Sequence, residues 1–123
     1  MSTTEQLQQE ISIVCDLRAI PTNDRKEHIA RAKRLLGFEF QERQELPDGY
    51  VWRFTADQYE DVCKYIAYDR LCCSFLTYCL EMTPQRGPIW LRITGNPEGK
   101  TALMDAISDL PNVDPSTLAA SVA

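Results

Sequence analysis

The sequence predicts an α+β fold: a two-layer sandwich in which helices cover one face of a four-stranded antiparallel sheet. Two observations lead to this prediction. First, apolar and polar residues alternate with period two on both sides of a turn, as they do in strand pairs, and this happens twice. Second, each hairpin is followed by apolar residues at helical spacing. The resulting ββα units span residues 38–73 and 75–110, and their hairpins can join into one sheet.

Length and composition are those of one domain over residues 1–123. Hydrophobic residues make up 44% of the chain, which is enough to build a core without disulfide staples. The polar start is compatible with either a short helix or extended structure, and we expect residues 1–14 to fray. Residues 111–123 begin with proline and are rich in small side chains, so we expect a loose tail.

Charge and hydropathy exclude several classes of partner. The net charge of -5 argues against a nucleic-acid partner, because phosphate binding needs a concentrated basic surface. The basic residues between 25 and 34 alternate with acidic ones, which is typical of a solvated helix face. No apolar run is long enough to cross a membrane, and the N-terminus lacks the pattern of a signal peptide. We therefore expect a cytoplasmic protein without a membrane partner.

Turn and capping residues mark the first elements. Asn23 is a suitable N-cap and Gly37 a suitable C-terminal stop. Pro47-Asp48-Gly49 predicts a hairpin turn, because proline presets φ and glycine accepts left-handed backbone. The elements expected here are a helix over residues 24–36 and strands over residues 38–46 and 50–55.

The second helix and hairpin follow the same logic. Thr55 and Gln58 match a capping box, so a helix is expected from there to about residues 71–73. Its expected buried positions are Tyr59, Val62, Cys63 and Ile66. Later, Asn96 and Pro97 suit the cap and first position of a last helix. The remaining expected elements are strands over residues 75–82 and 89–94 and a helix over residues 97–110, buried through Leu103, Ala106, Ile107 and Leu110.

The most chemically specific feature is the adjacent pair Cys72-Cys73 at the end of the second helix. The chain has five cysteines, and an odd number without a secretion signal favours reduced thiols over a disulfide framework. Adjacent thiolates suit a soft ion, provided that the helix ends there and lets them converge. On a continuous helix Cys73 would face inward and leave Cys72 more available. Cys15 precedes a loop and is a candidate third ligand, and Arg70 is a candidate cation to stabilise a thiolate.

Two other interpretations of the pair stay open. Cysteine is a small apolar residue, so the chain is also compatible with a non-enzymatic structural or dimerisation module whose cysteines only pack. A reversible Cys72–Cys73 disulfide would instead indicate a redox enzyme or sensor. The spacing of a tetrahedral zinc site is absent, and the single histidine, His28, gives little support for Cys–His catalysis. We identify no catalytic residue, and enzymatic activity is left open.

Two segments also resemble a family of small, largely uncharacterised bacterial proteins. The family carries an acidic-Arg-x-Cys-Cys-Pro-Phe motif and a later Trp-Leu-x-x-Thr-Gly motif. The matching segments here are residues 69–76, Asp-Arg-Leu-Cys-Cys-Ser-Phe-Leu, and residues 87–95, Gly-Pro-Ile-Trp-Leu-Arg-Ile-Thr-Gly. Residues 45–50 and 15–17 also look like family features, so the resemblance covers residues 15–110.

Position by position, the resemblance carries over Cys15, Cys72 and Cys73 but neither Cys63 nor Cys79. Ser74 stands where the family usually has proline, which would stop the helix after the thiols. Some members occur in heavy-metal-resistance contexts, and this implies a thiol–metal role.

The sequence thus predicts cytosolic binding of a soft metal or metalloid ion, such as Hg(II), As(III) or Zn(II), through Cys72 and Cys73. Cys15 is the candidate third ligand and Arg70 the supporting cation. Because one sheet face is expected to lack helices and aromatic residues fall on exposed strand positions, a homodimer is also predicted.

Overall fold

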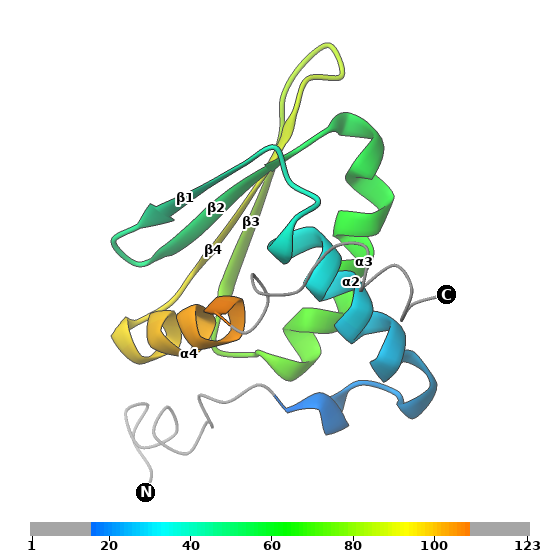
Figure 1. Ribbon diagram of the computed structural model, residues 1–123, viewed down its shortest axis with the longest axis vertical. Coiled ribbons are helices and arrows are strands. Elements are labelled where there is room, and N and C mark those ends of the chain that lie inside the picture. The colour runs from blue at the N-terminus through cyan, green and yellow to red at the C-terminus, as the bar shows by residue number, and fades with distance from the viewer. Residues whose placement is uncertain (1–15, 109–123) are drawn as a thin grey trace, which may run out of the picture.

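The computed structural model describes residues 16–108 (Figure 1). The predictions for residues 1–14, Cys15, Leu110 and residues 111–123 lie outside this range. Within it, no helix is both long and apolar enough to span a bilayer. The elements in chain order are η1 (Leu17–Ala19), η2 (Thr22–Asp24), α2 (Arg25–Gly37), β1 (Glu42–Leu46), β2 (Gly49–Phe54), η3 (Ala56–Gln58), α3 (Tyr59–Cys72), β3 (Thr77–Met82), β4 (Ile89–Thr94) and α4 (Pro97–Ser108).

The predicted sheet is confirmed. Its four strands lie in the order β1-β2-β4-β3, and every neighbouring pair is antiparallel. Each hairpin pairs its own two strands, and β2 and β4 join the hairpins at the centre. Helices α2, α3 and α4 lie on one side of the sheet in Figure 1, which gives the two predicted layers. The other face is covered by no described element.

The core lies between the sheet and the three helices. Alternate strand residues face it, and the largest of them, Trp52 and Phe54, have no solvent exposure. The Trp52 indole Nε1 donates to the Leu36 carbonyl oxygen at 3.3 Å, so its one polar atom is satisfied. Burying each such side chain stabilises the fold by about 1.5–3 kcal/mol. The other core members are Leu35, Leu36, Val62, Tyr65, Ile89, Leu91, Ile93, Leu103 and Ile107.

Helix starts follow the predicted capping chemistry at two of three places. The Thr55–Gln58 capping box is present, although a 3₁₀ turn separates it from α3. Asn96 Oδ1 accepts from the Gly99 N–H at 2.7 Å and caps α4. At α2, however, the N-cap is Asp24 and not Asn23, because the preceding 3₁₀ turn delays the helix to Arg25.

The predicted strand over residues 38–46 is too long, because β1 begins only at Glu42. The N–H groups of Phe38 and Glu39 both donate to the Arg34 carbonyl, at 3.1 and 2.7 Å. These bonds close the end of α2 and hold the next residues out of the strand. Phe40 packs against the core from this connection.

The buried stripe of α3 also differs from the prediction. Val62 is buried as expected, but Tyr59 is 43% exposed and Cys63 is only half-buried. The buried positions continue instead through Tyr65, Asp69 and Cys72. This side of α3 faces α2 as well as the sheet, so contact with the other helix decides the stripe.

Ion pairs join α2 to the first turn of α3. Arg31, predicted to be solvated, is only 5% exposed, and its Nε donates to Asp61 Oδ1 at 2.9 Å. Arg34 Nη1 bonds Asp61 Oδ2 at 3.1 Å. Buried arginine is tolerated because carboxylates pair with it, and these pairs fix how the helices face each other.

Candidate metal centre

The thiol pair lies where α3 ends, as the metal hypothesis required. Cys72 is the last helical residue, and Cys73 leaves helical geometry at φ -116° and ψ 62°. The Cys73 N–H still donates to the Asp69 carbonyl at 2.7 Å, and Leu76 N–H donates to the Cys73 carbonyl at 3.3 Å. This turn stops the helix directly after the thiol pair without a proline at position 74.

The end of the helix brings the two thiols together. Their Sγ atoms are 3.6 Å apart. Both side chains are buried, at 5% exposure for Cys72 and 3% for Cys73, and they pack with Ile20 from the loop before α2. The expectation that Cys72 would be the more available thiol is wrong, because the turn and Ile20 enclose both residues.

The cysteines differ in oxidation state. Cys63, Cys72 and Cys79 are free thiols, whereas Cys73 is disulfide-bonded in this structure. This departs from the expectation that all thiols are reduced. Because Cys72 is free, the structure contains no Cys72–Cys73 disulfide.

The other two predicted site residues are placed differently. Cys15 lies outside the described residues, but the next residue, Asp16, donates its N–H to the Cys72 carbonyl at 2.9 Å. The described chain therefore starts beside the thiol pair. Arg70 is exposed and lines a shallow hollow with Tyr78, and it makes no described contact with the thiols.

A second group of side chains, which the sequence did not predict, surrounds the Cys72 thiol. We call His28, Asp69 and Cys72 the inner cluster. His28 Nε2 lies 3.2 Å from Asp69 Oδ1, and the Cys72 thiol donates to the same oxygen at 3.7 Å. All three side chains are buried. His28 comes from α2, so the packing of α2 on α3 brings the cluster together.

Asp69 is the centre of this network. Its Oδ2 accepts hydrogen bonds from the hydroxyl of Tyr65, at 3.0 Å, and from that of Tyr78 on β3. The Tyr65 ring also stacks on His28 with centroids 5.7 Å apart. Both carboxylate oxygens are therefore satisfied, as a buried Asp requires. By contrast, His28 Nδ1 is buried and has no hydrogen-bond partner among residues 16–108.

The electrostatics oppose the role expected for Arg70. Burial, and then the neighbouring Asp69 carboxylate, raise the pKa of the Cys72 thiol to about 12. The same two causes raise the pKa of Tyr65 and of Tyr78. Cys72 is thus a protonated donor at neutral pH, and not a thiolate activated by arginine.

The inner cluster has the donor atoms of a metal site. One imidazole nitrogen, one carboxylate oxygen and one sulfur all lie within 4.8 Å of one another. Such a set suits divalent ions of intermediate softness.

Comparison with known protein families, curated proteins and solved structures found no match.

Sequence reasoning missed His28 and Asp69 for a definable reason. Charged and polar helix residues normally lie on solvated surfaces, so neither residue is expected in a buried site. One signal was available: Tyr65, Asp69, Cys72 and Cys73 are spaced by four, three and one, which places the first three on one side of a helix. No spacing connects this side to His28.

Proposed function

We propose that the reduced protein binds a soft metal or metalloid ion through the thiols of Cys72 and Cys73. The observation that supports this most strongly is the 3.6 Å separation of the two sulfur atoms. Two sulfurs bound to one tetrahedral zinc ion, each at about 2.3 Å, lie about 3.8 Å apart. The helix end therefore holds the sulfurs at nearly the spacing that chelation needs.

The chemistry of the pair sets the conditions for binding. Thiolates are the ligands that soft ions prefer, and an ion must displace the thiol proton of Cys72 to bind. Cys73 contributes only when its disulfide is reduced. A reducing cytoplasm, the predicted location, would keep both thiols available. Cys15 is the proposed third thiolate, as the motif resemblance implies.

Metal titration of the reduced protein, followed by native mass spectrometry, tests the proposal. We expect one ion per chain with Hg(II), As(III) or Zn(II), and loss of binding in the double variant Cys72→Ser/Cys73→Ser. Cys63→Ser and Cys79→Ser serve as matched controls, because these thiols lie elsewhere in the chain. If the double variant binds as tightly as the wild type, the proposal is wrong.

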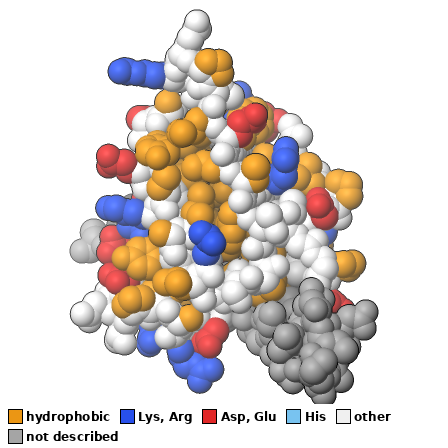
Figure 2. Space-filling model, turned by 180° about the vertical axis from the view of Figure 1, so that it is seen from behind, with side chains coloured by type: hydrophobic (Ala, Val, Ile, Leu, Met, Phe, Trp, Pro, Cys, Tyr) orange, Lys and Arg blue, Asp and Glu red, His pale blue; other side chains and the backbone are white. Residues whose placement is uncertain are grey.

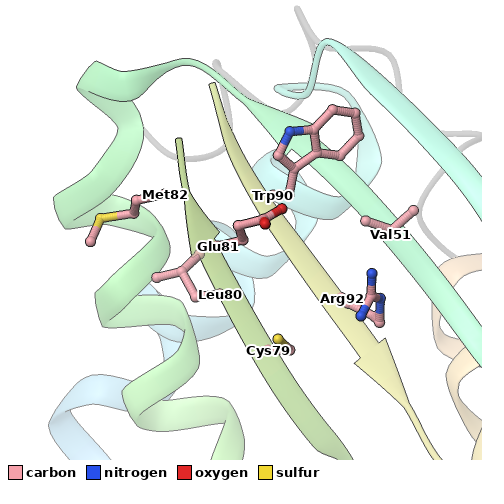
Figure 3. Close-up of a pocket in the computed structure, with 7 residues that line it drawn as sticks. All are labelled: Val51, Cys79, Leu80, Glu81, Met82, Trp90 and Arg92. Atoms are coloured by element: carbon pink, nitrogen blue, oxygen red, sulfur yellow. The ribbon is translucent and has the colours of Figure 1, made fainter. Parts of the chain in front are cut away.

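A second candidate function is dimerisation through the sheet face that is covered by no helix within residues 16–108. Figure 2, viewed from behind, shows hydrophobic side chains gathered over the middle of the molecule with charges of both signs around them. On the strands of this face, Trp90 and Cys79 lie beside Glu81 and Arg92 (Figure 3). They line a shallow groove of about 440 Å³. An apolar centre with a polar rim is typical of an interface.

The charges on this face favour a second copy of the same chain as the partner. Arg53 and Arg92 are matched by Glu42 and Glu81, although the whole chain has a net charge of -5. A two-fold axis can set the arginines of one copy against the glutamates of the other. A nucleic acid would instead need a surplus of positive charge.

Sedimentation over a range of protein concentrations tests the dimer. We expect reversible association in the wild type and weaker association in Trp90→Ala, because this change removes an aromatic side chain from the inner strand β4 of this face. Tyr59→Ala, at an exposed aromatic residue on α3, is the control. A monomer at every concentration would refute this candidate.

A further inference from the structure

The residues of the inner cluster indicate more closely than the thiol pair alone which ion the site prefers. From its geometry we infer that His28 and Asp69 are first-sphere ligands beside Cys72, and that the site prefers Zn(II)-like divalent ions to trigonal metalloids such as As(III). This inference rests on the proposed function, because it assumes that the Cys72 site binds an ion. It differs from the sequence prediction, which placed only thiolates around the ion.

The distances from Asp69 Oδ1 to the other ligand atoms are close to those around a tetrahedral ion. With bonds of about 2.0–2.3 Å, the ligand atoms of a zinc site lie roughly 3.3–3.8 Å apart. The nitrogen–oxygen distance from His28 to Asp69 is 3.2 Å, and the sulfur–oxygen distance from Cys72 to Asp69 is 3.7 Å. Cys73 Sγ lies 4.0 Å from the same oxygen and is placed to supply a fourth ligand after reduction.

Two tyrosines act as positioning residues for the carboxylate. The hydroxyls of Tyr65 and Tyr78 both bond Oδ2 of Asp69. This leaves Oδ1 directed at His28 and Cys72, so Asp69 can contribute one oxygen and not two. Ligand carboxylates in metal sites are commonly held by hydrogen bonds of this kind.

Charge balance favours a divalent ion. The ion displaces the proton of the Cys72 thiol and binds the neutral His28 ring through Nε2, with the ring proton on Nδ1. The charge of +2 is balanced by the Asp69 carboxylate and the Cys72 thiolate, which suits a buried site. A metalloid that requires three thiolates is disfavoured, because two of the three ligand atoms of the inner cluster are a nitrogen and an oxygen.

The surroundings of His28 limit the affinity of the site for zinc. His28 Nδ1 has no hydrogen-bond partner in the described part of the chain, whereas the second nitrogen of a ligating histidine usually donates to an acceptor. Loss of such a partner typically lowers metal affinity about 10–100-fold. We therefore expect weaker zinc binding than in a structural zinc site with a complete outer shell.

Two measurements on the reduced protein test the inference. X-ray absorption of the Zn(II)-loaded wild type should show a mixed shell of sulfur and nitrogen or oxygen at four-coordinate distances. Co(II) loading should give the visible bands of a tetrahedral ion together with sulfur-to-cobalt charge transfer. An all-sulfur shell, or a six-coordinate shell without sulfur, would overturn the inference.

A variant separates this inference from the proposed function. His28→Gln should lower Zn(II) affinity by about tenfold or more and leave As(III) affinity unchanged. Equal Zn(II) affinity in His28→Gln and the wild type overturns the role of His28 while leaving the thiol proposal standing. Unchanged binding in Cys72→Ser/Cys73→Ser refutes the thiol proposal itself. Circular dichroism monitors folding of the variants, and X-ray absorption of the wild type remains decisive if His28→Gln does not fold.

Discussion

The hydrogen bond from Tyr65 to Asp69 offers a sharp test of the buried network. Tyr65 is 2% exposed, and its hydroxyl lies 3.0 Å from Asp69 Oδ2. Tyr65→Phe keeps the ring and its packing but removes this one donor. A hydrogen bond to a charged group contributes about 1.5–3 kcal/mol, so we expect a loss of about 2 kcal/mol in the free energy of unfolding. For a small domain this corresponds to roughly 10 °C in Tm.

Urea denaturation at neutral pH measures the effect. Tyr50→Phe is the matched control, because the Tyr50 hydroxyl makes no hydrogen bond to a described residue and its ring is half-buried on the core face. We expect the control to change the free energy of unfolding by less than about 0.5 kcal/mol. Combining Tyr65→Phe with Asp69→Asn should reduce the penalty of the first change, since the charge has gone. Equal stabilities of Tyr65→Phe and Tyr50→Phe would show that Asp69 does not need this donor.

Three further predictions concern pH and backbone packing. Because the pKa of Cys72 is raised to about 12, only about one Cys72 thiol in ten thousand is ionised at pH 8. Alkylation of Cys72 should therefore be far slower than alkylation of the exposed Cys79, and its rate should rise tenfold per pH unit. Peptide mass spectrometry after timed labelling checks both expectations. Burial raises the pKa of Asp61, but hydrogen bonds from arginines, Arg34 foremost, outweigh it and lower the pKa. Asp61 thus stabilises the fold above its unfolded pKa of about 3.9 and loses this contribution as the pH falls, so the stability gap between the wild type and Asp61→Asn in urea titrations should shrink in acid. A Cβ on Gly49 would lie 2.0 Å from a backbone oxygen of β4, so Gly49→Ala should destabilise the protein by about 1–3 kcal/mol in thermal unfolding, and an unchanged Tm would contradict this close approach.

The local pattern of the sequence was enough to predict most of the fold. Alternating residues predicted both hairpins, and the capping residues at Thr55 and Asn96 predicted two helix starts. These features depend on neighbours within a few residues, so a single sequence carries them. The strand over residues 38–46 failed because bonds at the end of α2 compete with strand pairing, and its alternation of aromatic residues did not reveal this.

The candidate site was only half predictable. The adjacency of Cys72 and Cys73, together with a strand pattern soon after, indicated a helix end where the thiols converge, and the structure has both features. The burial of Cys72 depends on Ile20, which is distant in sequence. The raised pKa of this thiol depends in turn on its burial and on Asp69, so the chemistry could not be judged from the motif.

The sequence by itself therefore determined the strands, the helices and the existence of a thiol pair, because these follow from residue types at short separation. Only the tertiary structure decided which polar residues join the pair. His28 and Asp69 are separated by 41 positions, and each looks like a surface residue on its own helix. They are buried together because α2 packs on α3. Asp69 is tolerated there because His28 and two tyrosine hydroxyls replace its hydrogen bonds to water, and Asp69 in turn is the hydrogen-bond partner of His28 Nε2.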